Sequence, residues 1–250
     1  MFLGKIKAII YYIYFVLSVF VVVFFMAIKN SSHRHFRRIW AKFQRYFLRY
    51  KIEIIGTPDE NANMVILNHQ SIIDIVVMEE IHKANLSWIA KKEIARIPII
   101  GKIITLPKMI AIDRSNPRDL VRVLHEVEDR IKNNRVIAMF PEGTRRKGDK
   151  LLKFQTGAKV ITEKLKLKVQ PVVLLGTREI LDSHNFCANF FGNVKVVYLP
   201  LVDTTDKDWL EKTRSKMQEI LDENLHEDSN ELPDASENLN ETKTDKISEK

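Results

Sequence analysis

From residue 51 onward the chain alternates between short apolar runs and longer stretches whose apolar residues recur every three or four positions. Short runs are typical of buried strands, and the longer spacing is typical of helices that pack one face against a core. Strands that alternate with helices favour an α/β or mixed α+β domain, with a partly parallel sheet and flanking helices. The pattern predicts strands near 51–55, 64–68, 86–90, 109–113, 135–140, 169–175 and 193–199, and helices near 72–83, 117–133, 157–167 and 207–224.

A different hydrophobic pattern precedes this body. Residues 8–28 form an uncharged run of 21 residues, which as a helix would extend about 31 Å and match the hydrocarbon thickness of a bilayer. A signal peptide is the alternative, but the run is longer than usual for such peptides and continues into Lys29 without a small-residue cleavage site. We therefore expect a retained membrane anchor, which either spans the bilayer or enters one leaflet as a hairpin with the next helix.

The segment after the anchor is strongly basic. Residues 29–51 contain eight Lys or Arg and no acidic residue, an excess typical of the cytoplasmic side. We expect an amphipathic helix that lies against anionic headgroups, with a core-packing helix and a solvated basic face as the alternative. Its basic face comprises Arg34, Arg38, Lys42, Arg45 and Arg49, and its apolar face comprises Phe36, Ile39, Trp40, Phe43, Phe47 and Tyr50.

The net charge of +8 is unevenly distributed. Residues 226–250 carry eight acidic residues and three Lys, which leaves +13 for the rest of the chain. A basic body suits phosphate groups, phospholipid headgroups or nucleic acid, and charge alone does not choose among them. The polar tail lacks aromatic residues, which predicts disorder. We expect an anchor with a basic helix at 1–50, a folded domain at 51–225 and an acidic disordered tail at 226–250.

Cys187 is the only cysteine. A single cysteine excludes an internal disulfide and agrees with a reducing compartment. Because no motif surrounds it, Cys187 is a weak candidate nucleophile.

The first candidate for chemistry is the pair His69 and Asp74, in the stretch Asn68-His69-Gln70-Ser71-Ile72-Ile73-Asp74. The apolar run before His69 predicts a strand, so His69 falls at the carboxyl end where α/β proteins place their ligands. Five residues within one helix would separate the two side chains by about 140°, so a contact requires His69 to precede the first helical turn. Ser71 and Asp74 also fit a capping box, and these residues alone leave capping and catalysis both open.

Two further stretches carry charge at the ends of predicted strands. Phe140-Pro141-Glu142-Gly143-Thr144-Arg145 follows an apolar strand, and its Pro and Gly predict a tight loop whose amides and arginines suit a phosphate. Ile112-Asp113-Arg114 places another arginine at a strand exit. Taken separately, the first stretch is equally typical of a polar turn, and the second of an ordinary charged strand end.

Together these residues resemble the glycerophospholipid acyltransferase family, most closely its lysophosphatidic acid acyltransferases. Residues 68–74 are similar to the family's first block, His-x4-Asp, and residues 101–114 are similar to its second. Residues 140–145 match the third block in full, and residues 169–173 resemble the fourth. Four blocks in family order are far more specific than any single match. Asp rather than Glu at position 74 separates the chain from the lipid A acyltransferase branch.

The resemblance implies that a membrane-bound enzyme moves an acyl group from a thioester to the free sn-2 hydroxyl of 1-acylglycerol 3-phosphate and forms phosphatidic acid. Histidine is suited to accept the hydroxyl proton near neutral pH. His69 is then the general base, Asp74 orients its imidazole as in a Ser-His-Asp triad, and Ser71 is an N-cap rather than a nucleophile. The residues expected to bind the acceptor phosphate are Arg114, Glu142, Gly143, Thr144 and Arg145.

The same resemblance implies direct transfer, with acyl-CoA or acyl carrier protein as the donor, and this chemistry needs no metal or cofactor. The basic excess after the anchor predicts that the reaction takes place on the cytosolic face of the cytoplasmic membrane. Glycerol 3-phosphate or another lysolipid is the alternative acceptor. The alternative of another class is a non-catalytic membrane protein that binds anionic lipid and has no need of His69. Nucleic acid is not an expected partner, because the basic cluster adjoins the anchor and no known nucleic-acid-binding motif occurs.

Overall fold

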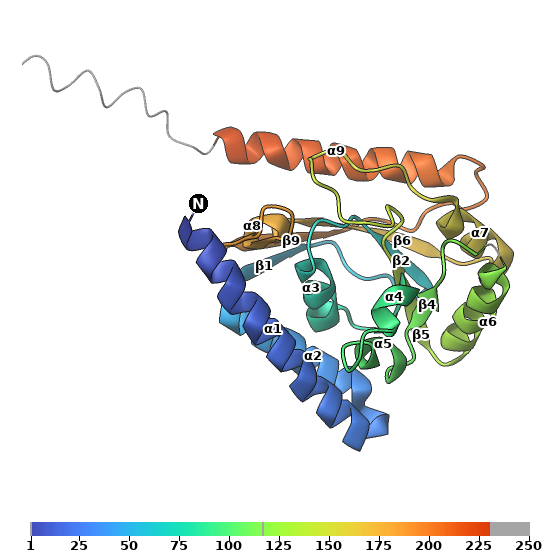
Figure 1. Cartoon of the computed structure of the whole chain (residues 1–250). Helices are drawn as coiled ribbons and strands as arrows, with labels where there is room; N and C mark the ends of the chain where they lie inside the picture. The colour runs from blue at the N-terminus through green and yellow to red at the C-terminus, as the bar shows by residue number, and fades with distance from the viewer. Residues whose placement is uncertain (1, 117, 231–250) are drawn as a thin grey trace, which may run out of the picture.

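A seven-stranded, mostly parallel sheet forms the centre of the molecule (Figure 1), a computed structural model that describes residues 2–116 and 118–230. The strand order is β1-β9-β6-β2-β5-β3-β4, and neighbours pair in parallel except β6 and β9. All seven strands lie within one residue of their predicted bounds, so the predicted fold class is confirmed. The strands are β1 (Lys51–Ile55), β2 (Met64–Leu67), β3 (Asn85–Lys91), β4 (Ile110–Ile112), β5 (Arg135–Met139), β6 (Val169–Leu175) and β9 (Asn193–Tyr198).

Helices cover both faces of the sheet. In β2, Met64 and Ile66 pack with one hydrophobic cluster, whereas Val65 and Leu67 pack with another. Side chains alternate across a strand, so a central strand with helices on both sides is apolar at every position. On the face of Met64 and Ile66, the cluster contains side chains from α6 (Asp119–Lys132), α7 (Thr156–Leu165) and α9 (Trp209–Asn230). On the face of Val65 and Leu67, it contains side chains from α1 (Phe2–Ile28) and α3 (Ile73–Ile81).

Several short elements were not predicted. They are α4 (Lys92–Ala95), α5 (Lys102–Thr105), α8 (Thr177–Ile180), β7 (Leu181–Asp182) and β8 (Cys187–Ala188). Elements of two to four residues are too short to show either periodicity. At the other end of the scale, α9 continues to Asn230, so the expected tail does not begin at residue 226; residues 231–250 lie outside the described part of the chain.

The first two helices form an antiparallel hairpin (Figure 1). α1 is followed by a 3-10 turn, Asn30–Ser32, and by α2 (His33–Leu48). The Tyr11 hydroxyl donates to Gln44 Oε1 at 3.2 Å, and the Trp40 indole donates to Ser18 Oγ at 2.9 Å. By length and composition α1 is able to cross a bilayer, yet 28% of its most apolar 18-residue window is buried in the protein. Its buried side shares a core with the sheet, because Ala8 and Tyr11 belong to the same cluster as Val65.

No arginine or lysine of the predicted basic face of α2 is buried. Arg45, which belongs to that face, lies 2.7 Å from Glu80 and keeps 42% of its side chain exposed. Arg37, which was not part of the predicted face, is buried and paired with Glu79. The acidic end of α3, distant in sequence, therefore neutralises two arginines of α2, a contact that the sequence pattern did not indicate. Lys42 remains exposed, and so do Ile39, Phe43, Tyr46 and Arg49.

Candidate active site

His69 and Asp74 meet between β2 and α3. β2 ends at Leu67 and α3 begins at Ile73, so His69 precedes the first helical turn, as the contact requires. His69 Nδ1 lies 2.8 Å from Asp74 Oδ2, and the Asp74 side chain is fully buried while that of His69 is 15% exposed. A carboxylate accepts hydrogen bonds, so Nδ1 carries the proton and Nε2 keeps a free lone pair.

Asp74 also stabilises the start of α3, so the capping and orienting interpretations both apply. Its Oδ2 accepts hydrogen bonds from the Gln70 amide, at 2.7 Å, and from the Ser71 amide, at 3.0 Å. The Thr177 hydroxyl donates to Oδ1 at 2.5 Å. A buried carboxylate requires such donors to offset its lost hydration. One side chain therefore holds the loop, the helix start and the imidazole together.

Ser71 differs from its expected role. Its hydroxyl donates to the Leu181 carbonyl of β7 at 2.7 Å, and it accepts a long hydrogen bond, 3.3 Å, from the Ile73 amide. The residue immediately before α3 is Ile72, which makes no side-chain cap. Ser71 thus mainly fastens the loop to β7, and the capping contact is weak. Its side chain is completely buried.

An aromatic stack that sequence analysis missed fixes the plane of the His69 ring. The Phe140 ring lies parallel to it, with centroids 3.8 Å apart and planes 12° apart, and Trp88 stacks on Phe140 at 5.2 Å. Phe140 belongs to the third block, but its position after β5 carried no signal of a partner in the loop that follows β2. The stack leaves the imidazole little freedom to rotate away from Asp74.

The Gly143 loop approaches the same place from β5. Gly143 has φ 77°, a left-handed conformation that favours glycine, and a side chain there would meet the Arg114 guanidinium. Arg114 donates to the Gly143 carbonyl, and Arg145 donates to Ser183 Oγ at 2.9 Å. Arg114, Gly143 and Arg145, with Thr144, line the same cavity as His69. The structure thus brings together the arginines predicted from two separate strand ends.

Glu142 occupies a different position from the other predicted ligands. Its Oε1 accepts the His69 amide at 2.8 Å, and its Oε2 accepts the Leu152 amide at 2.9 Å. Burial raises the pKa of Glu142, while these amides and Arg146 lower it. Glu142 is 2% exposed and is not among the residues that line the cavity. Its carboxylate therefore ties the His69 loop to the Gly143 loop, a role that its sequence position did not indicate.

The cavity beside His69 has a volume of about 340 Å³ and a polar end. That end contains His69, Arg114 and Arg145, whereas most of the remaining wall is apolar. The other charged lining residues are Lys91 at the end of β3 and the pair Arg37 and Glu79 on the α2 and α3 side. The apolar wall includes Val19 and Val22 of α1, Ile75 of α3, Ile103 of α5, and Trp88 and Ile89 of β3. Such a cavity can accept an apolar chain whose polar end reaches the base and the arginines.

In residues 2–116 and 118–230, no group of three or more His, Cys, Asp or Glu side chains is arranged to hold a metal ion. The groups at the polar end are suited to acid–base chemistry and to anion binding.

Comparisons with known proteins agree with the four sequence blocks. A family model described as Acyltransferase matches residues 51–175. A 1-acyl-sn-glycerol-3-phosphate acyltransferase of Helicobacter pylori is 36% identical, over 84% of this chain and 90% of that protein. A chloroplastic enzyme of the same name from Arabidopsis thaliana is 30% identical over 80% of this chain, which spans 57% of that longer protein.

Among solved structures, the 1-acyl-sn-glycerophosphate acyltransferase PlsC from Thermotoga maritima is similar in fold. The TM-score is 0.68, and the match covers 90% of this chain and 97% of that one. At 24% sequence identity, this likeness shows the fold alone.

Proposed function

Because this chain belongs to the acyltransferase family, we propose that it moves a fatty acyl group from a thioester to the sn-2 hydroxyl of 1-acylglycerol 3-phosphate, giving phosphatidic acid. The observation that carries the proposal is the contact of His69 Nδ1 with buried Asp74, at 2.8 Å, beside two arginines at one end of an apolar cavity. The named relatives act on an acceptor of this kind.

His69 acts as the general base in this proposal. With Nδ1–H held by Asp74, Nε2 accepts the proton of the acceptor hydroxyl while that oxygen forms a bond to the thioester carbonyl carbon. The carbon–sulfur bond then breaks, and the imidazolium returns the proton to the departing sulfur. Asp74 remains ionised and stabilises the imidazolium, as in a Ser-His-Asp triad. The substrate supplies the nucleophile, so no acyl-enzyme is required.

The acceptor phosphate binds at Arg114, Arg145, Gly143 and Thr144 in this proposal. Support comes from the shared cavity wall and from the charge of the two guanidinium groups, which form strong hydrogen bonds to phosphate. Glu142 contributes indirectly by fixing the Gly143 loop against the His69 amide. A phosphate held there leaves a hydroxyl on the same glycerol within reach of the base.

The membrane arrangement that we propose is a hairpin of α1 and α2 in one leaflet. Support comes from the contacts of Tyr11 with Gln44 and of Ser18 with Trp40, which hold the two helices together, and from the exposed apolar side of α1. A helix with one side packed on a folded domain does not present a full apolar circumference to lipid. The eight basic residues in 29–51 favour the cytosolic face.

The test presents purified full-length protein in vesicles with each pair of acceptor and donor. Lysophosphatidate should be acylated faster than glycerol 3-phosphate or another lysolipid, with acyl-CoA and acyl carrier protein compared as donors. If the protein prefers another acceptor, the assignment of lysophosphatidate as the acceptor is wrong. If it transfers no acyl group with any pair, the proposed acyltransferase activity is wrong.

A further inference from the structure

The segment between β3 and β4 exposes three isoleucines within six residues. Ile94, Ile97 and Ile99 are 39%, 45% and 47% exposed, and Pro98 between them is also exposed. Isolated exposed apolar residues are normal on a soluble surface, but such a group on one short loop indicates a surface that binds something apolar. Its neighbours in sequence include the exposed Arg96.

The backbone of this segment presents Ile99 in an unfavourable conformation. Ile99 has φ 61°, in the left-handed region that a β-branched residue rarely adopts and that Gly or Asn adopts more easily. The turn is closed tightly, because the Gly101 amide donates to the Ile97 carbonyl at 2.7 Å. A side chain on Gly101 would collide with the carbonyl groups of Ala95 and Ile97. The turn thus exposes an isoleucine side chain at position 99, although Gly or Asn would suit its backbone conformation better.

The charges of the segment are mostly positive. Residues 91–108 contain five Lys or Arg and one acid, Glu93, which lies 3.4 Å from Lys91. Arg96, Lys102 and Lys108 are exposed around the isoleucines. Exposed isoleucines with surrounding cations match the two layers of an anionic bilayer surface, which offers acyl chains beneath negative headgroups.

The inner side of the same segment reaches the active-site cavity and α1. Ile94, Ile100 and Ile103 line the cavity beside His69. Ile100 and Ile103 also pack against the cluster that contains Val19 and Val22 of α1, and Figure 1 shows α5 beside the α1–α2 hairpin. The segment is therefore continuous with the hairpin proposed to enter the membrane. Its inner side forms one wall of the cavity, and its outer side exposes the isoleucines.

We propose that residues 94–99 insert into the anionic leaflet and provide the passage by which the acyl chain of the acceptor moves between bilayer and cavity. The claim that the acyl chain passes along these residues rests on the proposed function. The claim that they insert into the membrane does not, because insertion is measured without activity. Polar headgroups would stay with Arg96, Lys102 and Lys108, and the isoleucines would give the chain an unbroken apolar path.

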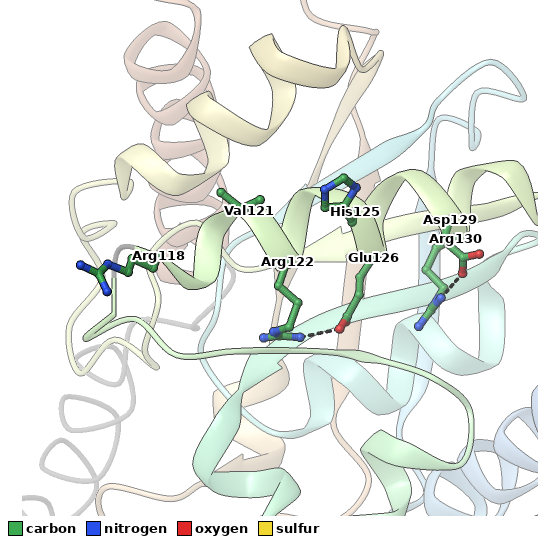
Figure 2. Close-up of a pocket in the computed structure, with 7 residues that line it drawn as sticks. All are labelled: Arg118, Val121, Arg122, His125, Glu126, Asp129 and Arg130. Carbon is green, nitrogen blue, oxygen red and sulfur yellow. Dashed lines mark hydrogen bonds and ion pairs between the residues drawn. The ribbon is translucent and has the colours of Figure 1, made fainter.

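The outer face of α6 provides a matched control (Figure 2). Val121 is 61% exposed there, among arginines as well, but Arg122 lies 2.5 Å from Glu126 and Arg130 pairs with Asp129. α6 packs on the opposite face of the sheet from the α1–α2 hairpin. A single apolar side chain on a face where two of the three arginines are paired with acids, far from the proposed membrane side, should remain in water.

Insertion is tested with a polarity-sensitive nitrobenzoxadiazole label on Ile97→Cys or Val121→Cys, each in a Cys187→Ser background of the full chain. With vesicles containing phosphatidylglycerol, the label at position 97 should shift to shorter wavelength, resist iodide and be quenched by spin-labelled lipid. The label at position 121 should show none of these changes. Equal behaviour of the two labels would overturn insertion. A response at position 97 to neutral phosphatidylcholine vesicles as strong as the response to anionic ones would overturn the role assigned to anionic headgroups.

The passage is tested with the double variant Ile97→Ser/Ile99→Asn, in which Asn suits the left-handed backbone. Loss of two apolar contacts with lipid should lower kcat/KM about tenfold or more for long-chain lysophosphatidate in vesicles. Activity on a short-chain lysophosphatidate dissolved as monomers should change less than about twofold, and sedimentation with vesicles should persist through the hairpin. Equal losses on both acceptors would overturn the passage. An inactive wild-type protein with an inserted label would refute the proposed function and leave insertion intact.

Discussion

At the scale of single residues, the site depends on atoms with more than one partner. Asp74 Oδ2 holds the imidazole and two backbone amides, and Glu142 joins the His69 and Gly143 loops through its two oxygens. Changes at these positions therefore affect geometry as well as chemistry. His69 is simpler, because its Nε2 is the atom left for the reaction.

His69→Ala should reduce turnover at least about a hundredfold, the lower scale for removing a general base. Folding and vesicle binding should persist, since the His69 amide and carbonyl that contact Glu142 and Arg146 remain in the variant. Steady-state acylation of lysophosphatidate, beside circular dichroism, measures both. Retained activity would exclude the mechanism and favour a non-catalytic lipid-binding protein.

Asp74→Asn should lower both turnover and stability. Asn offers one acceptor oxygen where Asp74 uses two, so a buried hydrogen bond is lost or reversed, at about 1–3 kcal/mol of unfolding free energy. Rate loss should exceed stability loss, because the imidazolium also loses its counter-charge. Thr177→Val is the control, because it removes the hydrogen bond to Oδ1 without touching Oδ2. If Thr177→Val lowers turnover as much as Asp74→Asn, the role of Asp74 is structural.

Arg145→Ala should relax selectivity for the phosphate of the acceptor. A charge-assisted hydrogen bond contributes about 1.5–3 kcal/mol, or roughly 10- to 150-fold in kcat/KM, and is absent for an uncharged monoacylglycerol. The ratio of kcat/KM for lysophosphatidate to that for monoacylglycerol is the measurement. Ser183→Ala serves as the control, because it removes the Arg145 partner but leaves the charge. Equal proportional losses on both acceptors would make Arg145 structural.

These residue-level features were predictable to different degrees. The contact of His69 with Asp74 followed from their spacing and from the strand before them, since local geometry limits a five-residue separation. The stack of His69 on Phe140 and the bridging role of Glu142 depend on β2 and β5 being neighbours in the sheet. No pattern within either strand carries that information.

At the scale of elements, apolar composition located the strands, whereas the partners of charged faces were not predictable. The sequence of α2 is strongly basic, but the acids that pair with Arg37 and Arg45 lie on α3, more than 30 residues away in sequence. Desolvation makes an unpaired buried arginine unfavourable, so the pairing of Arg37 with Glu79 decides how α2 sits.

Glu79→Ala should therefore destabilise the protein by about 3–5 kcal/mol, since it leaves the Arg37 charge buried without its partner. Denaturant unfolding in detergent, followed by circular dichroism, measures the effect. Lys216→Ala, in an exposed pair with Glu219, should change stability by less than about 1 kcal/mol. Similar small effects of both variants would show that Arg37 gains access to water, contrary to the packing described.

At the scale of the whole molecule, the hairpin and the body are one structure. Ala8 and Tyr11 share a core with the sheet, and Val19 and Val22 form part of the cavity wall. Deleting the hairpin would thus disturb the cavity as well as the membrane contact, and it would not separate the two. Substitutions confined to the exposed side of α1 do separate them.

Leu17, Val21 and Phe24 suit this purpose, because they are 61%, 56% and 61% exposed and share one helical side at spacings of four and three residues. Their triple replacement by Ser should lower partition onto anionic vesicles more than about tenfold, since each lost apolar side chain contributes on the order of 1 kcal/mol. Unfolding in detergent and activity on soluble short-chain lysophosphatidate should change little, because none of the three lines the cavity. Val121→Ser, at an equally exposed position on α6, should leave partition unchanged.

Sedimentation with vesicles at low and high salt separates the apolar from the electrostatic contribution to membrane binding. Salt screens the attraction of exposed Lys42 to headgroups but not the burial of apolar side chains. If the triple variant still sediments like wild type at high salt, α1 is not the element that enters the leaflet.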